Sequence, residues 1–170
     1  MINMTKTKRL AIDALLSAVA LIIFTIELQF PSLTPIPGIK LGLANIITLM
    51  AIFLLGPIDA LYVLLVRIFL GCLLTGQIMA LAYSLAGGAL SFVVMLIFRR
   101  FITNKQIFVC SIFGAMAHNI GQILIAVVIT QTTQVAYYLP ILMVSSIITG
   151  LFTGLAAQYT VIHLRNIKKY

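Results

Sequence analysis

The sequence contains very few charged residues, and this scarcity excludes most classes of soluble protein. Only 8% of its 170 residues are charged, whereas roughly a quarter of an ordinary soluble domain is charged. There are three carboxylates, Asp13, Glu27 and Asp59, and they fall on different predicted segments. Because magnesium sites in enzymes are usually built from clustered carboxylates, the sequence offers no such site.

Several sequence motifs that carry catalysis are also missing. No phosphate-binding glycine loop ending in Lys-Ser or Lys-Thr occurs, which excludes ATP hydrolysis by that route. No Gly-x-Ser-x-Gly sequence marks a hydrolase nucleophile. The two histidines, His118 and His163, lie on different predicted helices at different depths, so they do not form a metal-binding set. We therefore expect no catalytic residues, no metal and no cofactor, and a protein that is not an enzyme.

What the sequence does contain is apolar residues, which make up 62% of the chain. A soluble fold of this size cannot bury so much apolar surface, so the composition indicates a lipid bilayer as the solvent. A membrane-spanning helix needs about 20 mainly apolar residues. Six such helices with short loops use nearly the whole chain. The sequence therefore predicts an all-α membrane protein with a single six-helix transmembrane domain over residues 1–170.

Prolines, glycines and short polar runs set the boundaries of these helices. Three prolines and a glycine interrupt the apolar pattern at 31–38, and Gly56-Pro57 forms a tight turn. An alternative with five helices merges or omits the third segment, whose hydropathy is weakened by Arg67. Small residues at helical spacing in the fourth and sixth segments indicate close helix packing. The predicted helices are 10–30, 40–55, 57–74, 78–100, 107–130 and 136–163.

The net charge of +8 is explained by membrane topology rather than by nucleic-acid binding. Nine of the eleven basic residues flank predicted spans, and such residues mark the cytoplasmic side. We therefore expect a multi-pass protein of the cell membrane with both termini in the cytoplasm. The basic residues are Lys6, Lys8 and Arg9 before the first span, Arg99, Arg100 and Lys105 at one break, and Arg165, Lys168 and Lys169 after the last span.

Polar side chains within the spans are costly and indicate a functional site. Arg67 and His118 fall near the bilayer midplane, and the other members fall in its outer half. The guanidinium of Arg67 suits a carboxylate or phosphate, whereas amides both donate and accept hydrogen bonds. The alternative is a buried network that only holds helices together. The candidate substrate-binding residues are Asn45, Arg67, His118, Asn119, Gln122 and Lys40.

Four motifs in order resemble a known family. They are Pro37-Gly-Ile-Lys-Leu-Gly-Leu-Ala-Asn45, Leu65-Val-Arg67-Ile-Phe-Leu-Gly71, Ser84-Leu-Ala-Gly-Gly-Ala-Leu-Ser91 and Gly114-Ala-Met-Ala-His-Asn-Ile-Gly-Gln122. Over nearly its whole length the chain resembles the Gx transporter family, also labelled heptaprenyl diphosphate synthase component I. That family is grouped with the substrate-binding S components of energy-coupling factor (ECF) transporters. The resemblance implies an S-component-like bundle that binds a vitamin-like small molecule.

The resemblance also implies partners for this chain. S components dock onto a transmembrane coupling subunit and two cytoplasmic ATPase subunits, and they use an Ala-x-x-x-Ala surface on the first helix. Ala14 and Ala18 fit that surface. We expect an anionic or aromatic ligand to enter from outside, with segments 31–38 and 131–134 closing over it. The synthase label suggests an alternative, a non-catalytic accessory subunit of prenyl diphosphate or quinone biosynthesis, and a purely structural subunit is a third.

Overall fold

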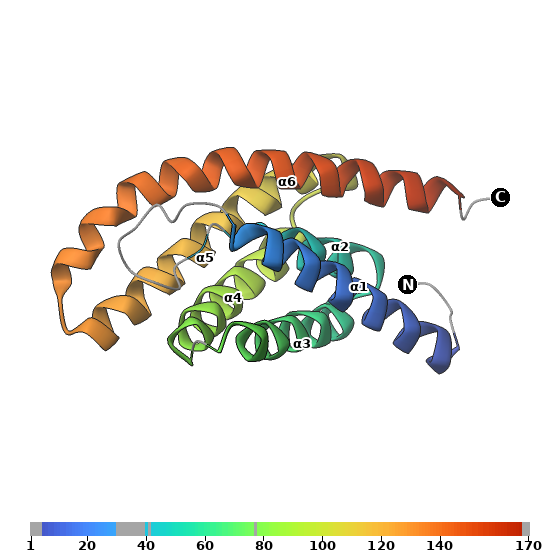
Figure 1. Ribbon diagram of the computed structural model, residues 1–170. Helices are drawn as coiled ribbons and strands as arrows, with labels where there is room; N and C mark the ends of the chain where they lie inside the picture. Colours follow the sequence, from blue (N-terminus) through green and yellow to red (C-terminus); the bar gives the residue numbers. More distant parts are fainter. Residues whose placement is uncertain (1–4, 30–39, 41, 77, 168–170) are drawn as a thin grey trace.

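The chain forms a bundle of helices in the computed structural model, which describes residues 5–29, 40, 42–76 and 78–167. Within these ranges all regular structure is helical (Figure 1). Five of the helices are long and apolar enough to cross a membrane, and one apolar helix is shorter. The helices are α1 (Lys6–Glu27), α2 (Asn45–Leu54), α3 (Pro57–Thr75), α4 (Ile78–Arg99), α5 (Ile107–Thr130) and α6 (Leu139–Ile167), with 3-10 helices η1 (Asn104–Gln106) and η2 (Thr133–Tyr138).

The short helix is α2, and it begins at Asn45 rather than at residue 40 as the sequence predicts. Gly42 has a φ of +80°, a left-handed conformation that favours glycine. Because this conformation is not that of an α-helix, the helix begins only after Gly42. Ten residues at about 1.5 Å each extend roughly 15 Å, about half of the hydrocarbon thickness of a bilayer. The third segment, which Arg67 made doubtful, is instead a full-length helix.

Although it is short, α2 occupies the centre of the bundle. It packs against each of the other five α-helices, while α5 packs along α4 and α6, and α1 lies against α3. Most residues of α2 are buried, including Leu49, Ala51 and Ile52, which are fully inaccessible. A helix that is apolar on all sides belongs in the interior. The long helices therefore form a shell around a short central one.

Close helix contacts depend on glycine where the sequence predicts packing. A Cβ atom on Gly87 of α4 would come within 2.8 Å of the backbone oxygen of His118 in α5. A Cβ on Gly150 of α6 would come within 2.7 Å of the Cα of Ile112 in α5. These distances confirm the predicted role of small residues, because close backbone approach drives helix association in lipid.

The chain runs back and forth through the bundle. The beginning of α1 and the end of α6 lie at the same end, as does the α2–α3 turn (right in Figure 1). The end of α3, the beginning of α4 and the α5–α6 connection lie at the opposite end. Arg99 at the end of α4 and Arg165 near the end of α6 line one groove together with residues of α1, so these basic residues lie on that side of the molecule.

Candidate ligand-binding site

Two of the predicted site residues meet at the beginning of the central helix. The tight turn at Gly56-Pro57 makes α2 and α3 antiparallel, so residues about three helical turns on either side of it become neighbours. Asn45 and Arg67 occupy these positions. The Nη2 of Arg67 donates to the Oδ1 of Asn45 at 3.2 Å, and both side chains are 4% exposed. Asn45 and Arg67 therefore form one side of the site, at the beginning of the central helix.

The α5 helix adds His118 and Gln122, which lie on one face because they are four residues apart. The Oε1 of Gln122 accepts a hydrogen bond from the backbone N–H of Lys40 at 3.3 Å. Two glycines make room for these side chains. A Cβ on Gly42 would lie 2.8 Å from the Cδ2 of His118, and one on Gly87 would lie 2.9 Å from the Cγ of Gln122. Backbone and side chains are thus packed to contact distance around the imidazole.

Two further charged side chains border this group. The carboxylate of Glu27, at the end of α1, is 5% exposed and accepts a hydrogen bond from the backbone N–H of Gly42. The Nζ of Lys40 lies 3.6 Å from the ring centroid of Phe24, a cation–π contact. Lys40 lies outside the membrane-spanning helices. Burial is the main cause that lowers the pKa of Lys40 to about 8; Glu27 opposes this shift and Arg67 contributes to it.

The cluster carries an excess of one positive charge when His118 is counted as neutral. Lys40 and Arg67 contribute two positive charges and Glu27 one negative charge. Among the described residues, the ion pair found is between Arg9 and Asp59. Neither Lys40 nor Arg67 therefore has a carboxylate oxygen within 4 Å. A buried site with this charge favours an anion.

Several buried polar atoms in the cluster have no hydrogen-bond partner among the described protein groups. Such atoms are uncommon in native proteins, and each costs about 1–3 kcal/mol. A network that served only to join helices would satisfy its own donors and acceptors. Most of these atoms are nitrogen donors, so the group complements an acceptor-rich molecule. The atoms are Lys40 Nζ, Asn45 Nδ2, Arg67 Nε, Gln122 Nε2 and His118 Nδ1.

Asn119 differs from the other predicted site residues because its amide nitrogen faces α6. Its Nδ2 donates to the backbone oxygen of Leu142 at 3.2 Å and to the Oγ of Ser146 at 2.6 Å. Adjacent residues on a helix point about 100° apart, so Asn119 and His118 contact different neighbours. No hydrogen bond found here joins Asn119 to the cluster. A ligand contact by Asn119 stays a prediction, for which its unpartnered Oδ1 is available.

Sequence reasoning missed the part played by Glu27 and Gly42. Glu27 was not among the predicted site residues, yet its carboxylate accepts a hydrogen bond from the segment before α2. An isolated glycine disfavours a helix by about 1 kcal/mol relative to alanine, so Gly42 was a signal against a helix that begins at residue 40. The predicted closing segment 31–38 lies outside the described residues.

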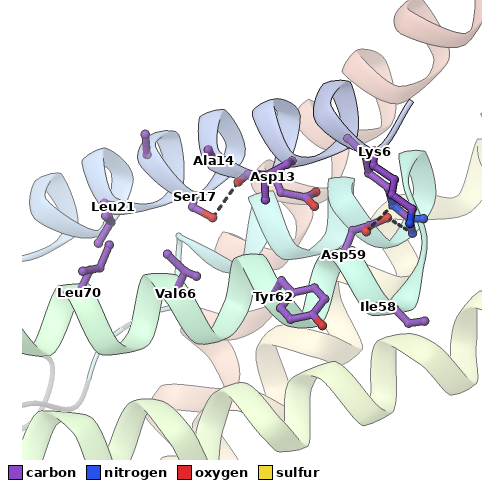
Figure 2. A pocket seen from close by; sticks show the side chains of 13 residues that line it. Lys6, Asp13, Ala14, Ser17, Leu21, Ile58, Asp59, Tyr62, Val66 and Leu70 are labelled. Atoms are coloured by element: carbon purple, nitrogen blue, oxygen red, sulfur yellow. Dashed lines mark hydrogen bonds and ion pairs between the residues drawn. The ribbon is translucent and has the colours of Figure 1, made fainter. Parts of the chain in front are cut away.

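The predicted partner-binding residues lie on a separate surface. Ala14 and Ala18 are exposed on α1 and line a groove of about 750 Å³ between α1 and α3 (Figure 2). Figure 2 shows Ala14 beside Ser17 on α1, with Val66 on α3 forming the facing wall. At the end of the groove where α1 begins, the lining is charged. It contains two acidic residues, Asp13 and Asp59, and two basic residues, Lys6 and Arg9.

Asp59 is engaged by Arg9 at that end of the groove. The Nε and Nη2 of Arg9 donate to the two carboxylate oxygens of Asp59, each at 2.7 Å. Asp59 lies in the first turn of α3, where the helix dipole favours a carboxylate. The bidentate geometry additionally fixes the beginning of α1 against α3.

Residues 16–160 match the sequence profile of the family described as heptaprenyl diphosphate synthase component I. The match covers most of the chain and includes all of the residues in the polar cluster. No curated protein and no solved structure has significant similarity to the chain.

Proposed function

The chain belongs to the heptaprenyl diphosphate synthase component I family, as its four motifs predicted, and we propose that it is the membrane-embedded substrate-binding subunit of an ECF-type transporter. The observation that carries this proposal is the donor-rich polar cluster at the beginning of α2. Buried polar atoms without partners are expensive to maintain, and within a membrane bundle they mark a ligand site.

The proposed ligand is a small anionic compound of vitamin or cofactor type. Arg67 Nε and Lys40 Nζ offer positive donors to a carboxylate or phosphate, and charge-assisted hydrogen bonds are the strong ones. Asn45 and Gln122 offer amide donors to further acceptors on the same molecule. His118 and the backbone around Gly42 supply a close-packed wall that limits the size of the ligand.

The energy for uptake would come from partner proteins, because the sequence has no ATP-hydrolysing motif. We place both termini in the cytoplasm, since the basic helix ends gather on one side of the bundle. The transmembrane coupling subunit, which carries two ATPase subunits, would dock on the α1 surface around Ala14 and Ala18. Both alanines are exposed, and small side chains permit the close helix approach that association in lipid requires.

A second candidate follows from the description of the family. A non-catalytic accessory subunit of prenyl diphosphate synthesis would also bind an anionic group, with an isoprenoid chain in place of a vitamin. The sequence lacks the Asp-rich motifs that bind magnesium diphosphate, so such a subunit would assist rather than catalyse. The polar cluster does not distinguish the two ligands, because both present a phosphate or carboxylate.

The decisive experiment is to purify the protein in a neutral detergent and identify co-purifying small molecules by mass spectrometry. A stoichiometric water-soluble vitamin or cofactor, lost from Arg67→Met and retained in the exposed control Tyr62→Phe, is the expected result. A stoichiometric prenyl phosphate with the same dependence on Arg67 would favour the accessory-subunit function instead. Retention of the molecule by Arg67→Met would place its site elsewhere.

A further inference from the structure

A second groove lies at the end of the bundle where α1 begins and α6 ends. It has a volume of about 540 Å³ and is bordered by α1, α2 and α6. Its walls are apolar, with Leu16 from α1, Phe53 from α2 and Leu164 from α6 among them. The charged side chains found in its lining are two arginines, Arg99 and Arg165. The groove is therefore apolar in its walls and basic in its charge.

The two arginines line this groove without acidic partners. The Nη2 of Arg165 donates to the backbone oxygen of Phe53, in the last turn of α2, at 2.6 Å. Arg99 is the last residue of α4, so its position is set by the helix end. Among the described residues neither arginine has a carboxylate oxygen within 4 Å, and no acidic residue contributes to the lining. Two positive charges thus remain available to an anion.

The depth of the groove limits what its walls can hold. The lining runs from residue 12 to residue 16 on α1, and from 50 to 55 at the end of α2. At 1.5 Å per residue these stretches are about 6–8 Å long. This depth accommodates the part of an amphiphile next to its head group, with the rest of its chains in the surrounding bilayer. Arginine at the membrane–water interface pairs with phosphate, which it can bind through two parallel hydrogen bonds.

We propose that this groove binds one anionic phospholipid, with its phosphate held between Arg99 and Arg165. The proposal requires that the helices span a membrane with their basic ends at the leaflet rich in anionic lipid, and it does not depend on the transport function. Phospholipid is the committed occupant because anionic lipids populate the leaflet that faces basic helix ends. The bound lipid would connect the central helix α2 to α4 and α6 through their terminal arginines.

The test compares phosphatidylglycerol with phosphatidylcholine on the full chain in a neutral detergent. Native mass spectrometry counts bound lipid, and a thiol-reactive dye follows thermal unfolding through the buried Cys110. We expect one phosphatidylglycerol per protein, and its preference over phosphatidylcholine should fall roughly five-fold in Arg99→Gln. Arg100→Gln is the matched control, because it removes the same charge from the next residue, which is exposed and does not line the groove.

Each other outcome overturns the proposal. Equal losses in Arg99→Gln and Arg100→Gln would mean that general surface charge, and not a site, attracts the lipid. The same thermal shift with inorganic phosphate alone would assign the site to a free anion. Displacement of phosphatidylglycerol by an equimolar prenyl diphosphate would assign it to that lipid. An Arg165 variant would also lose the hydrogen bond to Phe53 in α2, and its failure to fold would not test lipid binding. Arg99 makes no hydrogen bond among the described residues, so Arg99→Gln removes a charge without removing such a contact.

Discussion

Replacing Arg67 by methionine separates a binding role of this residue from a structural one. The buried guanidinium makes one hydrogen bond, from Nη2 to Asn45, and its Nε has no partner among the described groups. The guanidinium in this position gains little stabilisation from the rest of the protein. Methionine is an apolar side chain of similar length, so it occupies most of the same volume. The substitution removes the desolvation cost of the buried charge, but it leaves the Oδ1 of Asn45 without its donor, which costs about 1–3 kcal/mol. We therefore expect the free energy of unfolding to fall by less than about 3 kcal/mol.

Binding should respond far more strongly to the same substitution. An anionic ligand that accepts a hydrogen bond from Arg67 loses a charge-assisted interaction of about 1.5–3 kcal/mol. This loss corresponds to a roughly ten- to 150-fold weaker affinity. Ligand retained per mole of purified protein measures the effect, and thermal labelling of the buried Cys110 thiol measures stability in the same sample.

A double variant makes the two roles distinguishable. Asn45→Leu alone leaves the Nη2 of Arg67 without its acceptor and should destabilise the fold, because an unpaired buried donor costs about 1–3 kcal/mol. Adding Arg67→Met should restore most of that stability. If Arg67→Met instead lowers stability by more than about 3 kcal/mol and leaves ligand retention unchanged, Arg67 is a structural residue and the binding hypothesis is refuted.

Three further substitutions test other parts of the argument. Gly42→Ala should be less stable than Gly76→Ala, because both glycines have positive φ but only a Cβ at 42 clashes with His118; equal thermal shifts would contradict this. Binding of an anionic ligand should weaken as pH rises through about 8, where Lys40 loses its charge, and Lys40→Met should abolish that dependence in pH titrations of ligand retention. Without ligand, stability should rise with pH between about 8 and 10.5, because the unfolded chain then binds more protons than the folded one. Ala18→Leu should prevent copurification with the coupling subunit and leave ligand retention intact; unchanged copurification would remove α1 from the docking surface.

Much of the fold could be predicted because local signals along the chain are strong. The apolar composition requires a bilayer, and prolines and glycines mark most helix boundaries to within a few residues, as at the turn before Pro57. Arg67, His118 and Gln122 could be singled out because polar side chains are rare within spans. These signals depend on residue type and spacing alone.

The features that local sequence patterns did not predict depend on contacts between distant segments. The shortening of α2 follows from Gly42, whose backbone N–H bonds to Glu27 on another helix. The orientation of Asn119 towards α6 follows from its acceptors there, the backbone of residue 142 and the side chain of Ser146. Neither partner is near in sequence, so no local pattern predicts either contact.

The sequence by itself determined that the chain is a helical membrane bundle, that it belongs to its family, and that a few polar residues lie at membrane depth. Tertiary structure decided which of these residues face one another and which of their donors stay without partners. The physical reason is that helical periodicity fixes the direction of a side chain about its own axis. Which neighbour occupies that direction is set by how the helices pack around α2.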